Sequence, residues 1–172
     1  MLCDTSFFAA FNSQIVPTQL ALLDHIAVCH ELLLSNVFAV VKSMFDVPYA
    51  IDPLLIIDVR RMLIDRLILL LSLGHALPVM EFMHQRILSN DTSLTVHFIT
   101  QILPICGAPY SIHLVEAFLK ILSAGDILAS LKKKGAAMVD AINFLCRDMQ
   151  ETPSLSPDLR ERIEKITERM RA

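Results

Sequence analysis

With 172 residues, the chain is long enough to bury one sizeable hydrophobic core. Its residues are 54% hydrophobic, with four glycines, eight prolines and no tryptophan. This composition excludes a disordered chain, and its leucine-rich pattern favours helices over strands. The net charge of −3 argues against nucleic-acid binding through bulk electrostatics, although local basic patches stay open.

The first apolar piece of the chain, Phe7 to Phe11, has no helix cap of its own. We expect it to end a helix whose partner lies upstream, in which case Met1 opens a fragment or a shortened isoform. From Pro17 onward, start and stop signals recur and predict a series of helices. They span residues 17–29, 32–46, 53–73, 76–88, 93–106, 109–123, 126–133 and 136–149.

Residues 53–83 are predicted to form the central helical hairpin. Asp52 followed by Pro53 signals a helix start, because aspartate caps free amides and proline suits the first turn. Gly74 can adopt the left-handed conformation that closes the first helix. Apolar residues cover most of this helix, so we expect it to be buried on two or three sides.

Charged residues of the same helix fall into two groups. Asp58 and Asp65 lie on one face with Arg61 between them, which favours a solvated ion-pair stripe over paired catalytic carboxylates. Arg60 falls among apolar residues instead. It either extends to solvent near the helix start, or pairs with a carboxylate of a neighbouring hairpin or a partner chain.

The spacing of the helix pairs predicts the architecture. Predicted hairpins begin at Pro17, Pro53, Ser93 and Asp126, roughly 33 to 40 residues apart, near the period of paired-helix repeats. In residues 109–123 the pattern places Glu116 and Lys120 one turn apart, where they can form an ion pair. The predicted fold class is therefore all-α, a short α-solenoid of HEAT-like hairpins over residues 1–150.

A charged helix follows the predicted hairpin domain. Residues 151–156 are turn formers and read as a linker, and residues 157–172 alternate in charge. A narrow apolar seam runs along this helix, of the width used in helix pairing. It consists of Leu159, Ile163, Ile166 and Met170. We expect these side chains to dock on a partner helix or to fold back, and removal of residues 153–172 to weaken an assembly without unfolding the core.

Two long uncharged runs raise the question of a membrane. Residues 92–115 contain histidines, prolines and a glycine that interrupt a spanning helix. A bilayer has no water to satisfy the backbone groups freed at those breaks, so we expect two buried helices there. Residues 5–23 follow Asp4 rather than a basic segment, which argues against a signal peptide. The widely spaced Cys3, Cys29, Cys106 and Cys146 predict free, mostly buried thiols in a reducing compartment rather than a disulfide framework.

No catalytic or cofactor-binding signature stands out. His25, Cys29 and His30 have helical spacing, but a set of three or four metal ligands is missing. A cysteine–histidine nucleophilic pair would also need an oxyanion pocket, for which no glycine-rich loop is present. We therefore expect no enzyme activity, no cofactor and no metal.

The only basic run is Lys132, Lys133 and Lys134. It suits the last turn of a helix that ends at Gly135, because cations complement the helix dipole there. The alternative is that these lysines contact phosphate groups of nucleic acid. Replacing all three with glutamate in a reconstituted complex and measuring RNA affinity across salt would separate the two interpretations.

Several segments of the chain resemble one protein family in the same order. The central match consists of Arg61 to Leu67, Leu70 to Ser72 and Gly74 to Val79. Upstream and downstream the match continues with Pro17 to Asp24, Cys29 and His30, Ala108 to Tyr110, and Val115 to Leu122. Over roughly residues 15–149, the chain is similar to the C-terminal region of the negative elongation factor C/D subunit family.

This resemblance implies a nuclear, non-enzymatic scaffold in a complex with negative elongation factor A and B subunits. It also implies binding to RNA polymerase II, paused near promoters, and a link to single-stranded nucleic acid through basic patches. The competing hypotheses are a helical-repeat adaptor unrelated to transcription and a peripheral membrane protein. Recovery of sister subunits from nuclear extract would distinguish the elongation-factor role from an unrelated adaptor. Liposome flotation would test the peripheral membrane protein.

Overall fold

The computed structural model describes residues 17–47, 53–87 and 91–171. Every regular element in these ranges is helical, which confirms the all-α class. The chain divides into two compact units, Met1–Val79 and Met80–Ala172, here called the N-terminal and C-terminal units. The expected apolar piece Phe7 to Phe11 and the Asp52 cap lie outside the described residues. Stacking of all hairpins into one α-solenoid stays a prediction.

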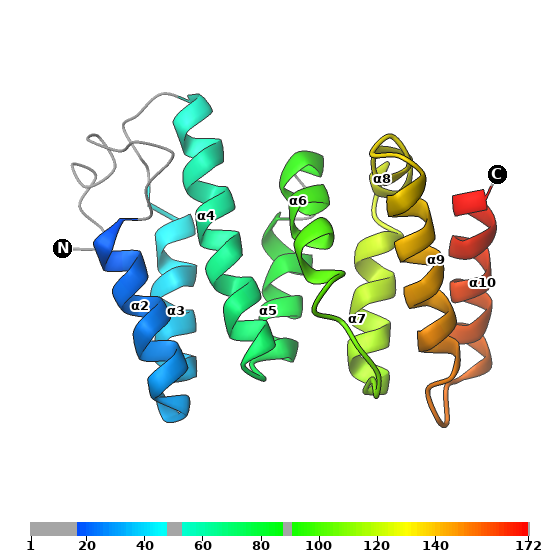
Figure 1. Ribbon diagram of the computed structural model, residues 1–172, viewed down its shortest axis with the longest axis horizontal. Coiled ribbons are helices and arrows are strands. Elements are labelled where there is room, and N and C mark those ends of the chain that lie inside the picture. Colours follow the sequence, from blue (N-terminus) through cyan, green and yellow to red (C-terminus); the bar gives the residue numbers. More distant parts are fainter. Residues whose placement is uncertain (1–16, 48–52, 88–90, 172) are drawn as a thin grey trace. The chain divides into compact units, whose positions relative to one another are not determined.

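The N-terminal unit is built around helix α4 (Pro53–Ser72), as expected for the central hairpin. Helices α2 (Thr18–Cys29) and α3 (Leu34–Phe45), joined by the short 3-10 helix η1 (Glu31–Leu33), both pack against α4 and against each other (Figure 1). Apolar side chains of α4 are closed off from solvent, because α4 is contacted by both helices. The buried apolar residues of α4 are Val59, Leu63, Ile64, Leu67 and Leu70.

The turn after α4 confirms the predicted stop at Gly74. Gly74 adopts a φ of 97°, and the amides of Gly74 and His75 donate to the carbonyls of Leu71 and Leu70 at 3.0 and 2.9 Å. These bonds satisfy carbonyls that the helix end would leave free. The His75 ring lies 5.1 Å from the ring of Phe38, so the turn also contacts α3.

Several predicted helix boundaries were wrong. Helix α5 (Ala76–Phe82) ends early and passes into a π-helical segment, Met83–Ile87. Helix α6 (Thr92–Ile102) starts where expected, because Asp91 accepts from the amides of Ser93 and Leu94, but it ends before Cys106. Helix α7 (Ile112–Leu122) begins after Pro109, because the Ser111 hydroxyl caps it by accepting from the Leu114 amide at 3.2 Å.

The C-terminal unit contains α6, α7, α8 (Ile127–Lys132), α9 (Ala136–Gln150) and α10 (Pro157–Arg171). Helix α10 packs along α9 and also contacts α7 and α8 (Figure 1). Fully buried Phe98 and Phe118 supply the largest side chains of this core. The predicted Glu116–Lys120 ion pair is present at 2.8 Å.

The long uncharged segment at residues 92–115 is folded into the C-terminal unit. Among the described helices, none combines the length and the hydrophobicity that a bilayer crossing requires. Residues 92–115, expected to form two buried helices, contribute α6 and the start of α7, with Leu94, Phe98, Ile99 and Val115 in the core.

Candidate interaction surfaces

The first part of the N-terminal unit carries exposed apolar side chains. Helix α2 carries apolar residues on all its sides, between a few polar ones, yet only Leu20, Leu23 and Ala27 are buried. Leu22 is 57% exposed, and Leu32, in η1, is 95% exposed. We call the exposed set the α2–η1 surface, consisting of Leu22, Val28, Leu32 and Leu33.

Single exposed leucines are common on protein surfaces and need no explanation. The α2–η1 surface is different, because its four exposed apolar residues fall within one short stretch, residues 22–33. Exposed apolar side chains this close along the chain make residues 22–33 a candidate site of protein contact. The α2–η1 surface is therefore the strongest candidate for partner binding in the N-terminal unit.

A fork of hydrogen bonds fixes the position of α2 on α4. Arg66 donates from Nη2 to Oδ2 of Asp24 at 2.8 Å and from Nε to Oδ1 at 3.2 Å. Its Nη1 donates to the Met62 carbonyl at 3.0 Å. The side chain of Arg66 is only 10% exposed, so this pair is held mostly away from water. The bidentate geometry sets the orientation of α2, and with it the α2–η1 surface.

The Arg66–Asp24 pair is the polar contact that the sequence analysis missed. The sequence pattern favours Arg60, which is exposed in the structure, and Arg61, which pairs with Asp58 at 3.5 Å within the expected stripe. A signal was available, because Arg66 is flanked by the buried Leu63, Leu67 and Leu70 on the same helical face.

The four seam residues of α10 lie inside the chain's own fold. Their exposed fractions are 6% for Leu159, 0% for Ile163, 3% for Ile166 and 1% for Met170. Of the two alternatives open from the sequence, the structure has α10 folded back onto α9, α7 and α8. Partner binding through this seam stays a prediction, and it would require α10 to separate from the C-terminal unit.

The three lysines occupy the end of α8 as the dipole argument expects. The Nζ of Lys132 donates to the Arg169 carbonyl at 3.1 Å, which ties the end of α8 to α10. Lys133 and Lys134 are exposed, and Gly135 follows with a φ of 110°. Lys132 thus has a structural contact, while nucleic-acid contact by the three lysines stays a prediction.

The three candidate metal ligands, His25, Cys29 and His30, do not form a compact site. The Sγ of Cys29 lies 3.7 Å from both ring nitrogens of His25, while His30 lies beyond the last residue of α2. Across residues 17–47, 53–87 and 91–171, no three histidine, cysteine or acidic side chains are grouped so that they could hold a metal ion.

The cysteines provide a test of these positions by thiol reactivity. Burial raises the pKa of Cys106 to about 11 and that of Cys146 to about 11, whereas Cys29 is exposed. At pH 8, roughly one thiol in a thousand is then ionised at Cys106, which is half-buried, and at Cys146, which is buried. The thiolate is the reactive form.

We therefore expect iodoacetamide at pH 8 to alkylate Cys29 rapidly and Cys106 and Cys146 slowly, as measured by peptide mass spectrometry. Raising the pH toward 11 increases the ionised fraction and should speed the slow sites by about tenfold per unit. Alkylation after unfolding in urea is the control and should equalise the three. Equal rates in the folded protein would contradict the raised pKa of the Cys106 and Cys146 thiols.

Together these features define an all-α protein of packed helices with exposed apolar side chains on its N-terminal unit. The model of the TH1 protein family matches residues 1–148, and the chain therefore belongs to this family. The resemblance to the negative elongation factor C/D subunit family, drawn from the ordered sequence segments, is thereby confirmed.

Curated relatives agree with the family match. The chain is 35% identical over 122 residues to Negative elongation factor D of Sus scrofa, covering 69% of this chain and 21% of that protein. It is 34% identical over 122 residues to Negative elongation factor D of Mus musculus, with the same coverage. The chain thus spans about a fifth of the length of these relatives. Helix α10 lies beyond the matched residues 1–148.

Proposed function

We propose that this chain acts as a non-enzymatic scaffold of a negative elongation factor complex in the nucleus. In this role it contributes to promoter-proximal pausing of RNA polymerase II by contact with other proteins. Membership of the TH1 protein family carries the proposal. The α2–η1 surface supports it, because exposed leucine and valine side chains are suited to partner contact and not to chemistry.

The mechanism that we propose is steric. The negative elongation factor A and B subunits are the proposed partners, and one of them would cover the α2–η1 surface. The Arg66–Asp24 fork would hold α2 in place during this contact, so that little ordering free energy is lost on binding. A complex assembled in this way would restrain polymerase motions needed for nucleotide addition.

Co-expression of the chain with the A and B subunits, followed by size-exclusion chromatography, tests the proposal. We expect the chain to co-elute with at least one of them. Absence of co-elution with either subunit would contradict the scaffold role, and the chain would then share only the fold of its family.

Substitution of the α2–η1 surface gives a sharper prediction. We expect the double variant Leu22→Glu, Leu32→Glu to weaken co-elution by at least about tenfold, because charges replace two exposed apolar side chains of the proposed contact. Thermal unfolding should change little, because both side chains are exposed.

Leu77→Glu is the matched control, because Leu77 is an exposed leucine of α5 outside this surface, and it should leave co-elution intact. An unchanged complex with the double variant would exclude the α2–η1 surface as the contact. The scaffold role itself would survive that result, because the unsubstituted chain would still co-elute.

A further inference from the structure

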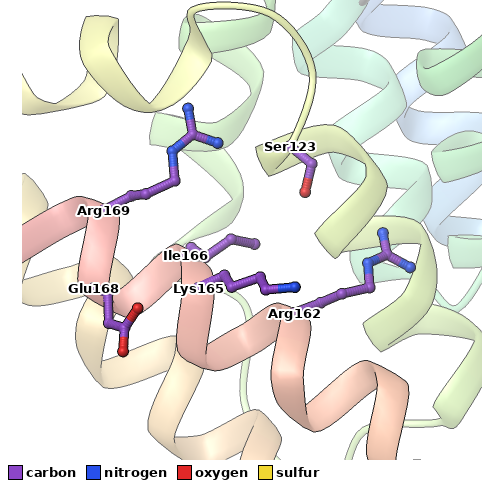
Figure 2. Close-up of a pocket in the computed structure, with 6 residues that line it drawn as sticks. All are labelled: Ser123, Arg162, Lys165, Ile166, Glu168 and Arg169. Atoms are coloured by element: carbon purple, nitrogen blue, oxygen red, sulfur yellow. The ribbon is translucent and has the colours of Figure 1, made fainter.

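A basic hollow lies in the C-terminal unit between the end of α7 and helix α10. It has a volume of about 270 Å³ and is lined by Ser123, Arg162, Lys165, Ile166, Glu168 and Arg169 (Figure 2). Three lining side chains are cationic and one is anionic, so the hollow favours an anion. Except for Ser123, the lining residues come from α10, beyond the family match.

The two arginines are the groups that remain open to a ligand. Figure 2 shows Arg162 and Arg169 reaching up from α10 on either side of the Ser123 hydroxyl. Neither guanidinium has an ion-pair partner within 4.0 Å among the described residues. Lys165 differs, because its Nζ already pairs with Glu161.

Neighbouring carboxylates weaken the basic character but do not cancel it. Glu116 pairs with Lys120 at 2.8 Å, and its pKa is lowered by the Lys120 hydrogen bond and, to a smaller extent, by the charge of Arg162. Glu168 lines the hollow, but in Figure 2 its carboxylate points away from both guanidinium groups. Arg162 and Arg169 therefore lie on opposite sides of the hollow, and neither has an ion-pair partner within 4.0 Å among the described residues.

The size and chemistry of the hollow favour one kind of anion. Its volume is below the roughly 300 to 1,000 Å³ of sites that enclose a whole small molecule, so it suits a single group of a larger partner. The lining has no aromatic side chain on which a nucleic-acid base could stack. Arginine forks match the oxygens of a phosphate group, and the Ser123 hydroxyl can donate to one of them.

We propose that this hollow, formed by Ser123, Arg162 and Arg169, binds a phosphorylated serine or threonine side chain of a partner protein. Recognition is by charge-assisted hydrogen bonds from the two guanidinium groups. The site is independent of the α2–η1 surface, which lies in the other unit.

The test is a titration of the ¹⁵N-labelled chain with the blocked peptide glycine–phosphoserine–glycine, followed by nuclear magnetic resonance. We expect saturable shifts of the Arg162 and Arg169 Nε–H signals and of the Ser123 amide. The unphosphorylated peptide should cause none. The double variant Arg162→Gln, Arg169→Gln should weaken binding by at least about fivefold, since both forks are lost.

Arg171→Gln is the matched control, because Arg171 is exposed on the same helix and lines a different groove. It should change the affinity less than about twofold. The circular dichroism melting curve of each variant shows whether α10 stays folded, and glutamine at these exposed or half-buried positions should preserve it.

Three results would overturn the proposal. The first is equal peptide affinity in the double variant and the unsubstituted chain. The second is equal affinity for inorganic phosphate and for the phosphoserine peptide, which would indicate a free anion. The third is tighter binding of a short oligouridine through the same two arginines, which would assign the hollow to nucleic acid.

Discussion

Ile163→Asp is expected to lower the free energy of unfolding of the C-terminal unit by more than about 4 kcal/mol. Ile163 is 0% exposed at the centre of the α10 seam, where α10 packs on α9. An aspartate there would place a carboxylate in an apolar contact without a partner. Urea unfolding followed by circular dichroism measures the change, and hydrogen exchange of the α9 and α10 amides locates it.

Glu164→Gln provides the control, because Glu164 is the exposed neighbour on the same helix and its substitution should be nearly neutral. If Ile163→Asp were as mild as the control, α10 would not be held by its seam. If α10 separated easily from α9, its apolar seam would be free to dock on a partner. That seam consists of Leu159, Ile163, Ile166 and Met170.

The packing of α10 also changes the expectation for a deletion. From the sequence, removal of residues 153–172 was expected to spare the core. In the structure α10 covers α9, whose Ile142, Cys146 and Met149 are at most 1% exposed. Removal of α10 would expose apolar surface on α9, so destabilisation of the C-terminal unit is now the expected result.

Local chemistry explains which features were predictable from the sequence. Gly74 ends α4, Asp91 caps α6, and the Ser156 hydroxyl accepts from the Leu159 amide at the start of α10. Each signal acts within a few residues, so it can be read without the fold. The apolar faces of α4 and α7 were predictable for the same reason, because helical periodicity is local.

Contacts between distant segments were not predictable in this way. Asp24 and Arg66 are far apart in sequence, and a helical wheel does not show which arginine meets a carboxylate of another helix. The seam of α10 has the same pattern whether it binds a partner or folds back. The α2–η1 surface was not predictable for a related reason, because apolar residues occur on all sides of α2 and the pattern does not tell which side stays exposed.

Arg66→Ala is expected to destabilise the N-terminal unit by about 2 to 3 kcal/mol. The substitution removes both hydrogen bonds to Asp24 and the bond to the Met62 carbonyl. Asp24 is 28% exposed, so water can partly solvate the carboxylate that remains, which places the effect below that of a fully buried pair. Urea unfolding measures the loss, and weaker co-elution with partner subunits should accompany it if α2 shifts.

A double-mutant cycle with Asp24→Ala isolates the pair from the packing of the arginine stem. We expect a coupling free energy of about 1 to 3 kcal/mol, because either single substitution leaves the other charge without its partner. The same cycle on the exposed Glu116–Lys120 pair is the control and should give a much smaller coupling, because water competes for both charges. Equal coupling in the two cycles would mean that the Arg66 guanidinium is solvated, and that apolar packing alone holds α2 against α4.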